Sequence, residues 1–150
     1  MRIAISTDQI KGAAPYLADE LRRRGHEVVP YGAFDPDHVS PFPNDWAPVS
    51  AAAAREVGSG LADQAVVCCW TGTGASIAAN KVDNVRAALC VDAETARGAR
   101  RWNDANVLAL SLRLTSGPML VEILDAWFDA DPSNEQSDVL NVEHVGLIRR

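Results

Sequence analysis

The chain has 150 residues and a mass of 16.1 kDa, a length that suits one compact domain. Its formal net charge of −6 argues against a nucleic-acid or anionic-membrane partner. No apolar run approaches the roughly 20 residues of a membrane-spanning helix, and the first residues do not read as a leader. The three cysteines follow no disulfide spacing, so we expect free thiols and a cytoplasmic protein.

Short apolar runs alternate along the first half of the chain with helical patterns. We expect, in order, a strand at Arg2–Ser6, a helix at Ala13–Arg24, a strand at Glu27–Pro30, a loop at Tyr31–Asp45, a helix at Trp46–Val57 and a strand at Ala65–Trp70. The last of these runs is apolar throughout, which is typical of a strand buried on both faces. Because strand side chains alternate, Cys68 and Cys69 should point to opposite faces of the sheet.

The alternation continues through the second half. We expect a turn at Thr71–Gly74, a short helix from near Ser76, a strand at Val85–Val91, a helix at Asp92–Trp102, a strand at Asn106–Leu112 and a helix at Ser116–Phe128. Asp92 and Ser116 are suitable N-caps for their helices. A polar hinge and an apolar stretch, VLNVEHVGLI, then make up a C-terminal extension over residues 130–150.

Five β–α alternations without a hairpin signal predict an α/β fold with a single domain over residues 1–150. Right-handed crossovers restrict it to a three-layer Rossmann-like (flavodoxin-like) sandwich with a five-stranded parallel sheet. Such folds bind ligands at the carboxyl ends of their strands. The loops of interest are therefore 8–12, 31–45, 71–74 and 112–117.

The glycine-containing turn Thr71–Gly74 follows the buried strand and precedes a helix. Its backbone N–H groups could hold a phosphate or the oxyanion of an enediolate. Cys69, at the end of that strand, could act as a base beside them, or it could be a packed core thiol, just as the turn could merely connect two elements. The pattern is neither G-x-G-x-x-G nor a P-loop, so a nucleotide site has little support.

We expect no metal or organic cofactor. The three histidines, at positions 26, 38 and 144, are scattered and have no ligand spacing.

Together these segments resemble the ribose-5-phosphate isomerase B and galactose-6-phosphate isomerase family over residues 1 to about 130. The densest similarity runs from Cys69 to Val107: C-W-T-G-T-G-A-S-I-A-A-N-K-V, then R-A-A-L-C-V-D, then T-A-R and N-D-A-N-V. The family pattern is C-G-T-G-I-G-x-S-I-A-A-N-K, then R-A-A-L, then T-A-R-x-x-R-x-H-N-D-A-N-V.

The resemblance implies an aldose–ketose isomerase that needs no metal and moves a proton between C1 and C2 of a sugar through a cis-enediolate. Cys69 resembles the base and Thr71 a helper in ring opening or proton relay. The other positions that it places around the substrate are Asp8, Gln9, Trp70, Gly72, Thr73, Gly74, Trp102, Asn103 and Arg113. Asp104 would contact the substrate or only brace its turn, and Asn80 would contact the substrate or only hold loops together.

The resemblance also implies a homodimer or homotetramer whose active sites combine residues of two subunits. The extension over residues 130–150 would then reach the neighbouring subunit. The other expected partner is a small sugar or sugar phosphate.

Several positions depart from the family pattern. Gln9 and Trp102 replace histidines, Trp70 replaces a glycine, and two phosphate-binding arginines fall on Leu140 and Asn141. Each lost charge-assisted hydrogen bond is worth roughly 1.5–3 kcal/mol, and Lys11 and Arg113 compensate only in part.

The tryptophans at 46, 70 and 102 would narrow the pocket, or one or two of them would pack at a subunit interface. The substrate is then a sugar phosphate or a modified, smaller or unphosphorylated sugar-like compound. The alternative is a catalytically idle member that serves as a structural or regulatory subunit. A flavin or nucleotide binder of flavodoxin type rests on fold analogy alone.

Overall fold

The computed structural model describes residues 1–35 and 44–148. In these stretches the strands are β1 (Arg2–Thr7), β2 (Glu27–Gly32), β3 (Gln64–Cys69), β4 (Ala87–Leu89) and β5 (Val107–Ser111). The helices are α1 (Ala14–Arg23), α2 (Trp46–Gly58), α3 (Thr73–Ala79), α4 (Ala93–Asn103), α5 (Gly117–Phe128) and α6 (Gln136–Leu147). Most of the loop expected at Tyr31–Asp45, with His38, lies outside the described residues, and Tyr31 and Gly32 belong to β2.

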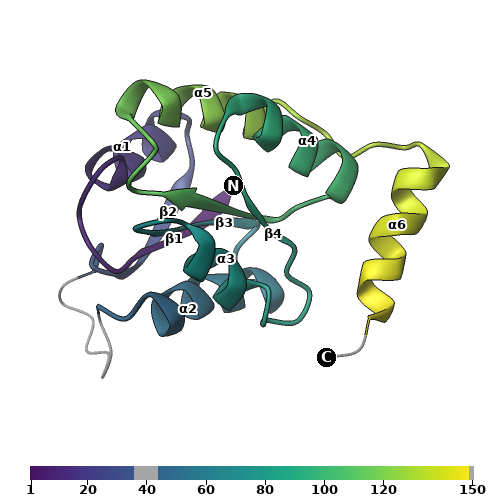
Figure 1. Cartoon of the computed structure of the whole chain (residues 1–150), viewed down its shortest axis with the longest axis horizontal. Helices are drawn as coiled ribbons and strands as arrows, with labels where there is room; N and C mark the ends of the chain where they lie inside the picture. Colours follow the sequence, from purple (N-terminus) through teal and green to yellow (C-terminus); the bar gives the residue numbers. More distant parts are fainter. Residues whose placement is uncertain (36–43, 149–150) are drawn as a thin grey trace.

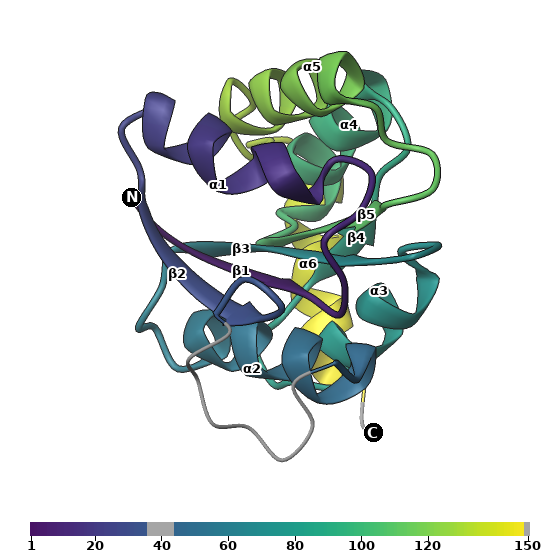
Figure 2. The ribbon, with the colours of Figure 1, turned by 90° about the vertical axis from the view of Figure 1, so that its left-hand side faces the viewer.

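The strands form one parallel sheet in the order β2-β1-β3-β5-β4. Helices α1, α4 and α5 cover one face of this sheet, and α2 and α3 cover the other (Figures 1 and 2). The predicted three-layer α/β sandwich is therefore confirmed. The flavodoxin order is 2-1-3-4-5, so here the last two strands are exchanged and β4, not β5, lies at the edge.

Alternate strand positions supply two separate apolar layers. Ile5 belongs to the layer under α1, α4 and α5, and Ala109 belongs to the layer above α2 and α3. All six residues of β3 are buried, as expected for a central strand covered on both faces. Cys68 packs in the first layer and Cys69 in the second, which confirms that the adjacent thiols point in opposite directions.

Two predicted helix starts are confirmed by their caps. The Asp92 carboxylate accepts a hydrogen bond from the Thr95 N–H at 2.7 Å. The Ser116 hydroxyl accepts one from the Met119 N–H at 3.3 Å. Each cap satisfies one of the N–H groups that a helix start leaves without an internal partner.

Two predicted boundaries were wrong. α3 begins at Thr73 instead of near Ser76, because Gly72 turns the chain directly into the helix. The strand expected at Val85–Val91 shortens to β4, Ala87–Leu89. At its free edge the Asn80 side chain takes the place of a further strand: it accepts from the Ala87 N–H at 2.9 Å and donates to the Ala87 carbonyl at 2.8 Å. Asn80 therefore holds the α3–β4 connection together.

α6 stands away from the sandwich at the end of an extended connection (Figure 1). It contacts α4, and none of its residues is buried. The helix begins at Gln136, inside the stretch that we expected to be a polar hinge. Of the helices that the structure describes, none combines the length and apolar character that a bilayer crossing requires.

Candidate active site

The loops that follow β1, β3 and β5 meet at the carboxyl edge of the sheet. The Leu112 N–H donates to the Cys69 carbonyl, and the Arg113 N–H donates to the Trp70 carbonyl, both at 3.0 Å. A Cβ atom on Gly12 would lie 1.9 Å from the Leu112 carbonyl oxygen, so the first loop touches the third. These contacts bring together residues separated by up to a hundred positions in the sequence.

Cys69 ends β3 in this cluster of loops. Its side chain is 5% exposed, and its Sγ atom accepts a hydrogen bond from the Ala75 N–H at 3.4 Å. This contact points a main-chain N–H group from the first turn of α3 at the sulfur atom. Cys68 lies in the opposite layer, and burial there raises the pKa of its thiol.

The loop after Cys69 is a tight turn around Gly72. Gly72 has φ +75°, and a Cβ there would lie 2.9 Å from the Leu110 carbonyl carbon and from the Ser111 nitrogen. Both the backbone conformation and the close approach of β5 therefore require glycine. Among the described residues, the N–H groups of Thr71, Thr73 and Gly74 donate to no protein acceptor. Free donors of this kind are usual in the first turn of a helix, and here they lie beside a cysteine.

Two hydroxyl groups stand at the mouth of this turn. The Oγ1 atoms of Thr71 and Thr73 are 2.7 Å apart and form a hydrogen bond, and both residues are exposed to solvent. The residue between them is Gly72, whose left-handed backbone brings the two side chains to the same side.

Asp8 follows β1 and carries a poorly satisfied carboxyl group. Its Oδ1 atom is buried and has no hydrogen-bond partner among the described residues. Burial raises the pKa of Asp8, and hydrogen bonds from its own backbone and from Gln9, with the charge of Lys11, offset part of this increase. A buried acceptor without a partner at a ligand-binding edge is suited to a hydroxyl group of a substrate.

Large aromatic rings border the loops. Trp70 is 48% exposed, and the Lys11 ammonium lies 6.0 Å from the centroid of its ring. Trp46, the first residue of α2, packs against the glycine turn: a Cβ on Gly74 would lie 2.9 Å from the Trp46 ring. Arg113 is exposed on the third loop. Trp46 and Trp70, two of the three tryptophans expected around the substrate, therefore lie beside the loops of the carboxyl edge.

Trp102 and Asn103 are not brought to this edge within one chain. They form the last turn of α4, which precedes β5, so they lie at the amino edge of the sheet. Trp102 is 51% exposed and lines a cavity of about 300 Å³ between α4, β4 and α6. Within one chain these two residues therefore lie apart from the predicted site residues at the carboxyl edge.

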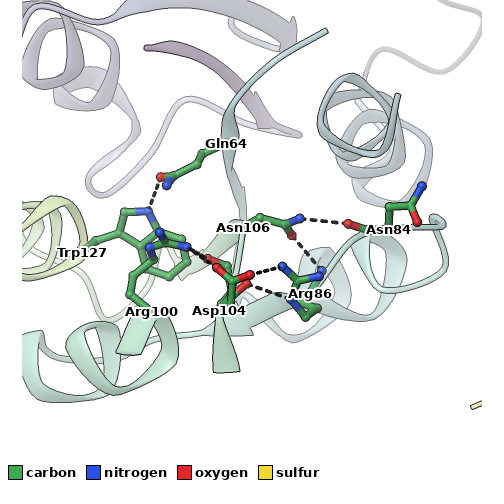
Figure 3. A network of polar contacts seen from close by, with 8 residues as sticks. Gln64, Asn84, Arg86, Arg100, Asp104, Asn106 and Trp127 are labelled. Carbon is green, nitrogen blue, oxygen red and sulfur yellow. Dashed lines mark hydrogen bonds and ion pairs between the residues drawn. The ribbon is translucent and has the colours of Figure 1, made fainter. Parts of the chain in front are cut away.

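Asp104 braces the turn before β5. It lies near the start of this strand, whereas Cys69 pairs with Ser111 at its end. The backbone of Asp104 has φ +42°. Its carboxylate oxygens form ion pairs with the guanidinium groups of Arg86 at 2.7 Å and of Arg100 at 3.4 Å. Figure 3 shows this network beside Asn106, which accepts from the Arg86 N–H, and beside the hydrogen bond from Trp127 to Gln64.

One contributor was missed by the sequence reasoning, the N–H group of Ala75. Its side chain carries no chemical signal, and only its place in the first turn of a helix hinted at a free donor. In the described part of the chain, no group of three potential metal-binding side chains gathers.

Comparison with known proteins agrees with this arrangement. A family model described as Ribose/Galactose Isomerase matches residues 3–144. A galactose-6-phosphate isomerase subunit LacB from Clostridium acetobutylicum is 36% identical over 127 residues, 83% of this chain and 70% of the relative. A D-erythrulose-4-phosphate isomerase from Pectobacterium atrosepticum is 36% identical over 115 residues, 77% of this chain and 73% of the relative.

Among solved structures, ribose-5-phosphate isomerase B from Clostridium thermocellum superposes with a TM-score of 0.84 at 34% identity, over 98% of this chain and 96% of that one. The match spans the sheet, the glycine turn and α6. The chain therefore belongs to the Ribose/Galactose Isomerase family of sugar-phosphate aldose–ketose isomerases.

Proposed function

We propose that the protein interconverts an aldose and a ketose with Cys69 as the base that moves a proton between C1 and C2. The contact that carries this proposal is the hydrogen bond from the Ala75 N–H to Sγ of Cys69. It holds the Cys69 sulfur atom next to main-chain N–H groups that donate to no acceptor among the described residues. A base and an oxyanion site must be adjacent for enolisation, because the negative charge that the base creates appears on the neighbouring oxygen.

The remaining groups at the carboxyl edge fit the needs of an enediolate intermediate. The free N–H groups of Thr71, Thr73 and Gly74 would hold the developing oxyanion. The Thr71 hydroxyl would move a proton on the sugar oxygen, and the unpaired Oδ1 of Asp8 would accept a sugar hydroxyl. Gln9 would contact the substrate from the same loop.

The substrate is a short sugar. The indoles of Trp46 and Trp70 lie beside the glycine turn and leave less room than smaller residues would. The relatives described above are named for galactose 6-phosphate, D-erythrulose 4-phosphate and ribose 5-phosphate. A four- or five-carbon sugar, phosphorylated or carrying another group at the far end, fits this smaller site best.

The active unit is a dimer or a tetramer in which Trp102 and Asn103 of one subunit complete the site of another. Their exposure at the amino edge supports this arrangement. So does α6 with the residue that follows it, where the apolar side chains of Val139, Leu140, Val145, Leu147 and Ile148 are 40–75% exposed. The three cysteines are unpaired, which is consistent with a protein that works in the reducing cytosol.

The test is proton exchange at the substrate carbon in D₂O, followed by NMR with four- and five-carbon sugars and their phosphates. Cys69→Ala should lower exchange by about 10²- to 10⁴-fold, the usual contribution of a general base. Cys68→Ala is the matched control, since it removes the adjacent thiol from the opposite face and should retain exchange.

Equal losses in the two cysteine variants would contradict the role of Cys69. A wild-type protein that exchanges no substrate proton and co-purifies with a second homologous chain would instead be a structural or regulatory subunit.

A further inference from the structure

An anionic substrate needs positive charge at the site, and few cationic side chains of the described residues are free of ion pairs. Most of its arginines are held by acids, as in the pairs of Arg2, Arg22, Arg23, Arg24, Arg86, Arg97 and Arg100. Two cations follow the strands that form the site, Lys11 and Arg113. Neither forms an ion pair with any described residue, and both are exposed. At the edge where the substrate would bind, these charges remain available.

Lys11 is held in a defined place. The next residue, Gly12, has φ +55° and touches the Leu112 carbonyl, which fixes the loop against its neighbour. The Lys11 ammonium lies 6.0 Å from the centre of the Trp70 ring, at the outer range of a cation–π contact. An aromatic face attracts the charge but accepts no strong hydrogen bond, so the ammonium keeps N–H donors for another ligand.

The contact between Lys11 and Trp70 lies next to the proposed base. Trp70 directly follows Cys69, and its backbone carbonyl is held by the Arg113 N–H and by the Ser111 hydroxyl at 3.1 Å. The charged group of a sugar phosphate is several bonds away from the carbons that exchange the proton. A ligand for that group must therefore lie at some distance from Cys69, and Lys11 lies against the ring of the residue that follows Cys69.

We propose that Lys11, stacked on Trp70, binds the phosphate of the substrate and makes the enzyme prefer phosphorylated to neutral sugars. This inference rests on the proposed isomerase function and selects the phosphorylated sugars among its candidate substrates. Lysine binds phosphate as a point charge with three donors, so it needs no bidentate geometry. The Trp70 ring limits the region that the flexible lysine side chain explores, and this lowers the entropy that binding must overcome.

The kinetic test compares erythrulose 4-phosphate and ribose 5-phosphate with the free sugars, for wild type and for Lys11→Gln, Lys11→Arg and Lys81→Gln. Lys81 is the only other lysine of the chain, so Lys81→Gln makes the same change in net charge away from the loops. Lys11→Gln should raise KM for the phosphates by about 10-fold or more, with kcat nearly unchanged. It should leave kcat/KM for the free sugars unchanged. Lys11→Arg should retain most of the affinity.

Equal KM values in Lys11→Gln and Lys81→Gln would overturn the inference. Loss of turnover with free and phosphorylated sugars alike would do so as well, because it would show a role outside phosphate recognition.

A binding test separates this inference from the proposed function. Wild type is titrated with inorganic phosphate and followed by calorimetry and by tryptophan fluorescence, with Trp70→Phe to identify the responding indole. If wild type binds phosphate, Lys11→Gln does not, and no sugar is turned over, the anion site stands and the isomerase proposal falls. If sugars are turned over and Lys11→Gln binds phosphate like wild type, the isomerase proposal stands and the anion site falls. Absence of both turnover and phosphate binding overturns both.

Discussion

Asp8 is a partly buried carboxyl group for which we propose contact with the substrate. Burial raises its pKa above the ordinary value of 3.8, and Oδ1 has no partner among the described residues. In the pH range between the unfolded and the folded pKa, the folded state therefore binds more protons than the unfolded state. The free energy of unfolding then falls as the pH rises through this range, and the penalty is complete above the folded pKa.

Asp8→Asn removes this penalty because an amide does not ionise. We expect the variant to be more stable than wild type near pH 7 by less than about 1 kcal/mol, because solvent screens a carboxyl group that is only partly buried. It should gain nothing below the ordinary pKa of the carboxyl. Turnover should fall, since the amide no longer offers a charged acceptor to the sugar. Urea unfolding at the two pH values measures the first effect, with the exposed Asp131→Asn as the control. A variant less stable than wild type at pH 7 would contradict the argument.

The hydrogen bond between Thr71 and Thr73 suggests that one hydroxyl orients the other. Thr73→Val keeps the shape of the side chain and removes this bond, so kcat should fall by about 2- to 10-fold, equivalent to one neutral hydrogen bond. In a Thr71→Val background the same change should have no further effect, because the group that it orients is gone. Thr73→Ser should behave like wild type. Independent losses that multiply in the double variant would instead indicate direct contact of Thr73 with the substrate.

At the scale of elements, the alternation of apolar runs and helical patterns was enough to predict the sandwich. β3 was recognised because its run is apolar throughout, and α4 and α5 because Asp92 and Ser116 cap them. The strand at Val85–Val91 was predicted too long, since the Asn80 side chain that closes the edge of β4 acts through tertiary contacts. Local periodicity carries no information on such contacts.

For the same reason, the sequence predicts only in part where the candidate site residues lie in the fold. Cys69 and its turn follow β3, and a strand followed by a turn locates residues at the carboxyl edge. Trp102 and Asn103 precede β5, which locates them at the amino edge, yet the motif resemblance grouped them with the substrate. A motif can group residues that would meet only between subunits, whereas the order of strands and helices along the chain predicts where a residue lies within one subunit.

The ion pairs of Asp104, just before β5, connect α4 to the residue before β4. Asp104 receives Arg86 and Arg100, whose side chains are 28% and 12% exposed, and no other acid pairs with them in the described part of the chain. Asp104→Asn keeps a residue type that tolerates the left-handed backbone and removes only the charge. We expect a loss of about 1–2 kcal/mol, between the values of surface and buried pairs. Urea unfolding measures it, and an effect no larger than that of Asp131→Asn would contradict this role.

In the molecule as a whole, the residues of the proposed active site are divided between the two edges of the sheet. The carboxyl edge holds Cys69, its turn and Lys11, and the amino edge holds Trp102 and Asn103. α6 extends from the amino side with no buried residue (Figure 1). A two-fold assembly that places the amino edge of one subunit over the carboxyl edge of another would complete two sites at once.

This arrangement predicts complementation between two inactive variants. Cys69→Ala removes the proposed base and Asn103→Ala removes the group that one subunit would give to its partner, so each variant on its own would form dimers with two defective sites. After mixing in equal amounts with subunit exchange, half of the dimers are mixed, and each mixed dimer has one site with both groups intact. Activity should therefore return to about one quarter of the wild-type value for a two-fold dimer. The activity of the mixture is compared with that of each variant alone. A mixture no more active than the average of its parts, with exchange confirmed by native mass spectrometry, would show that each subunit works with its own residues only.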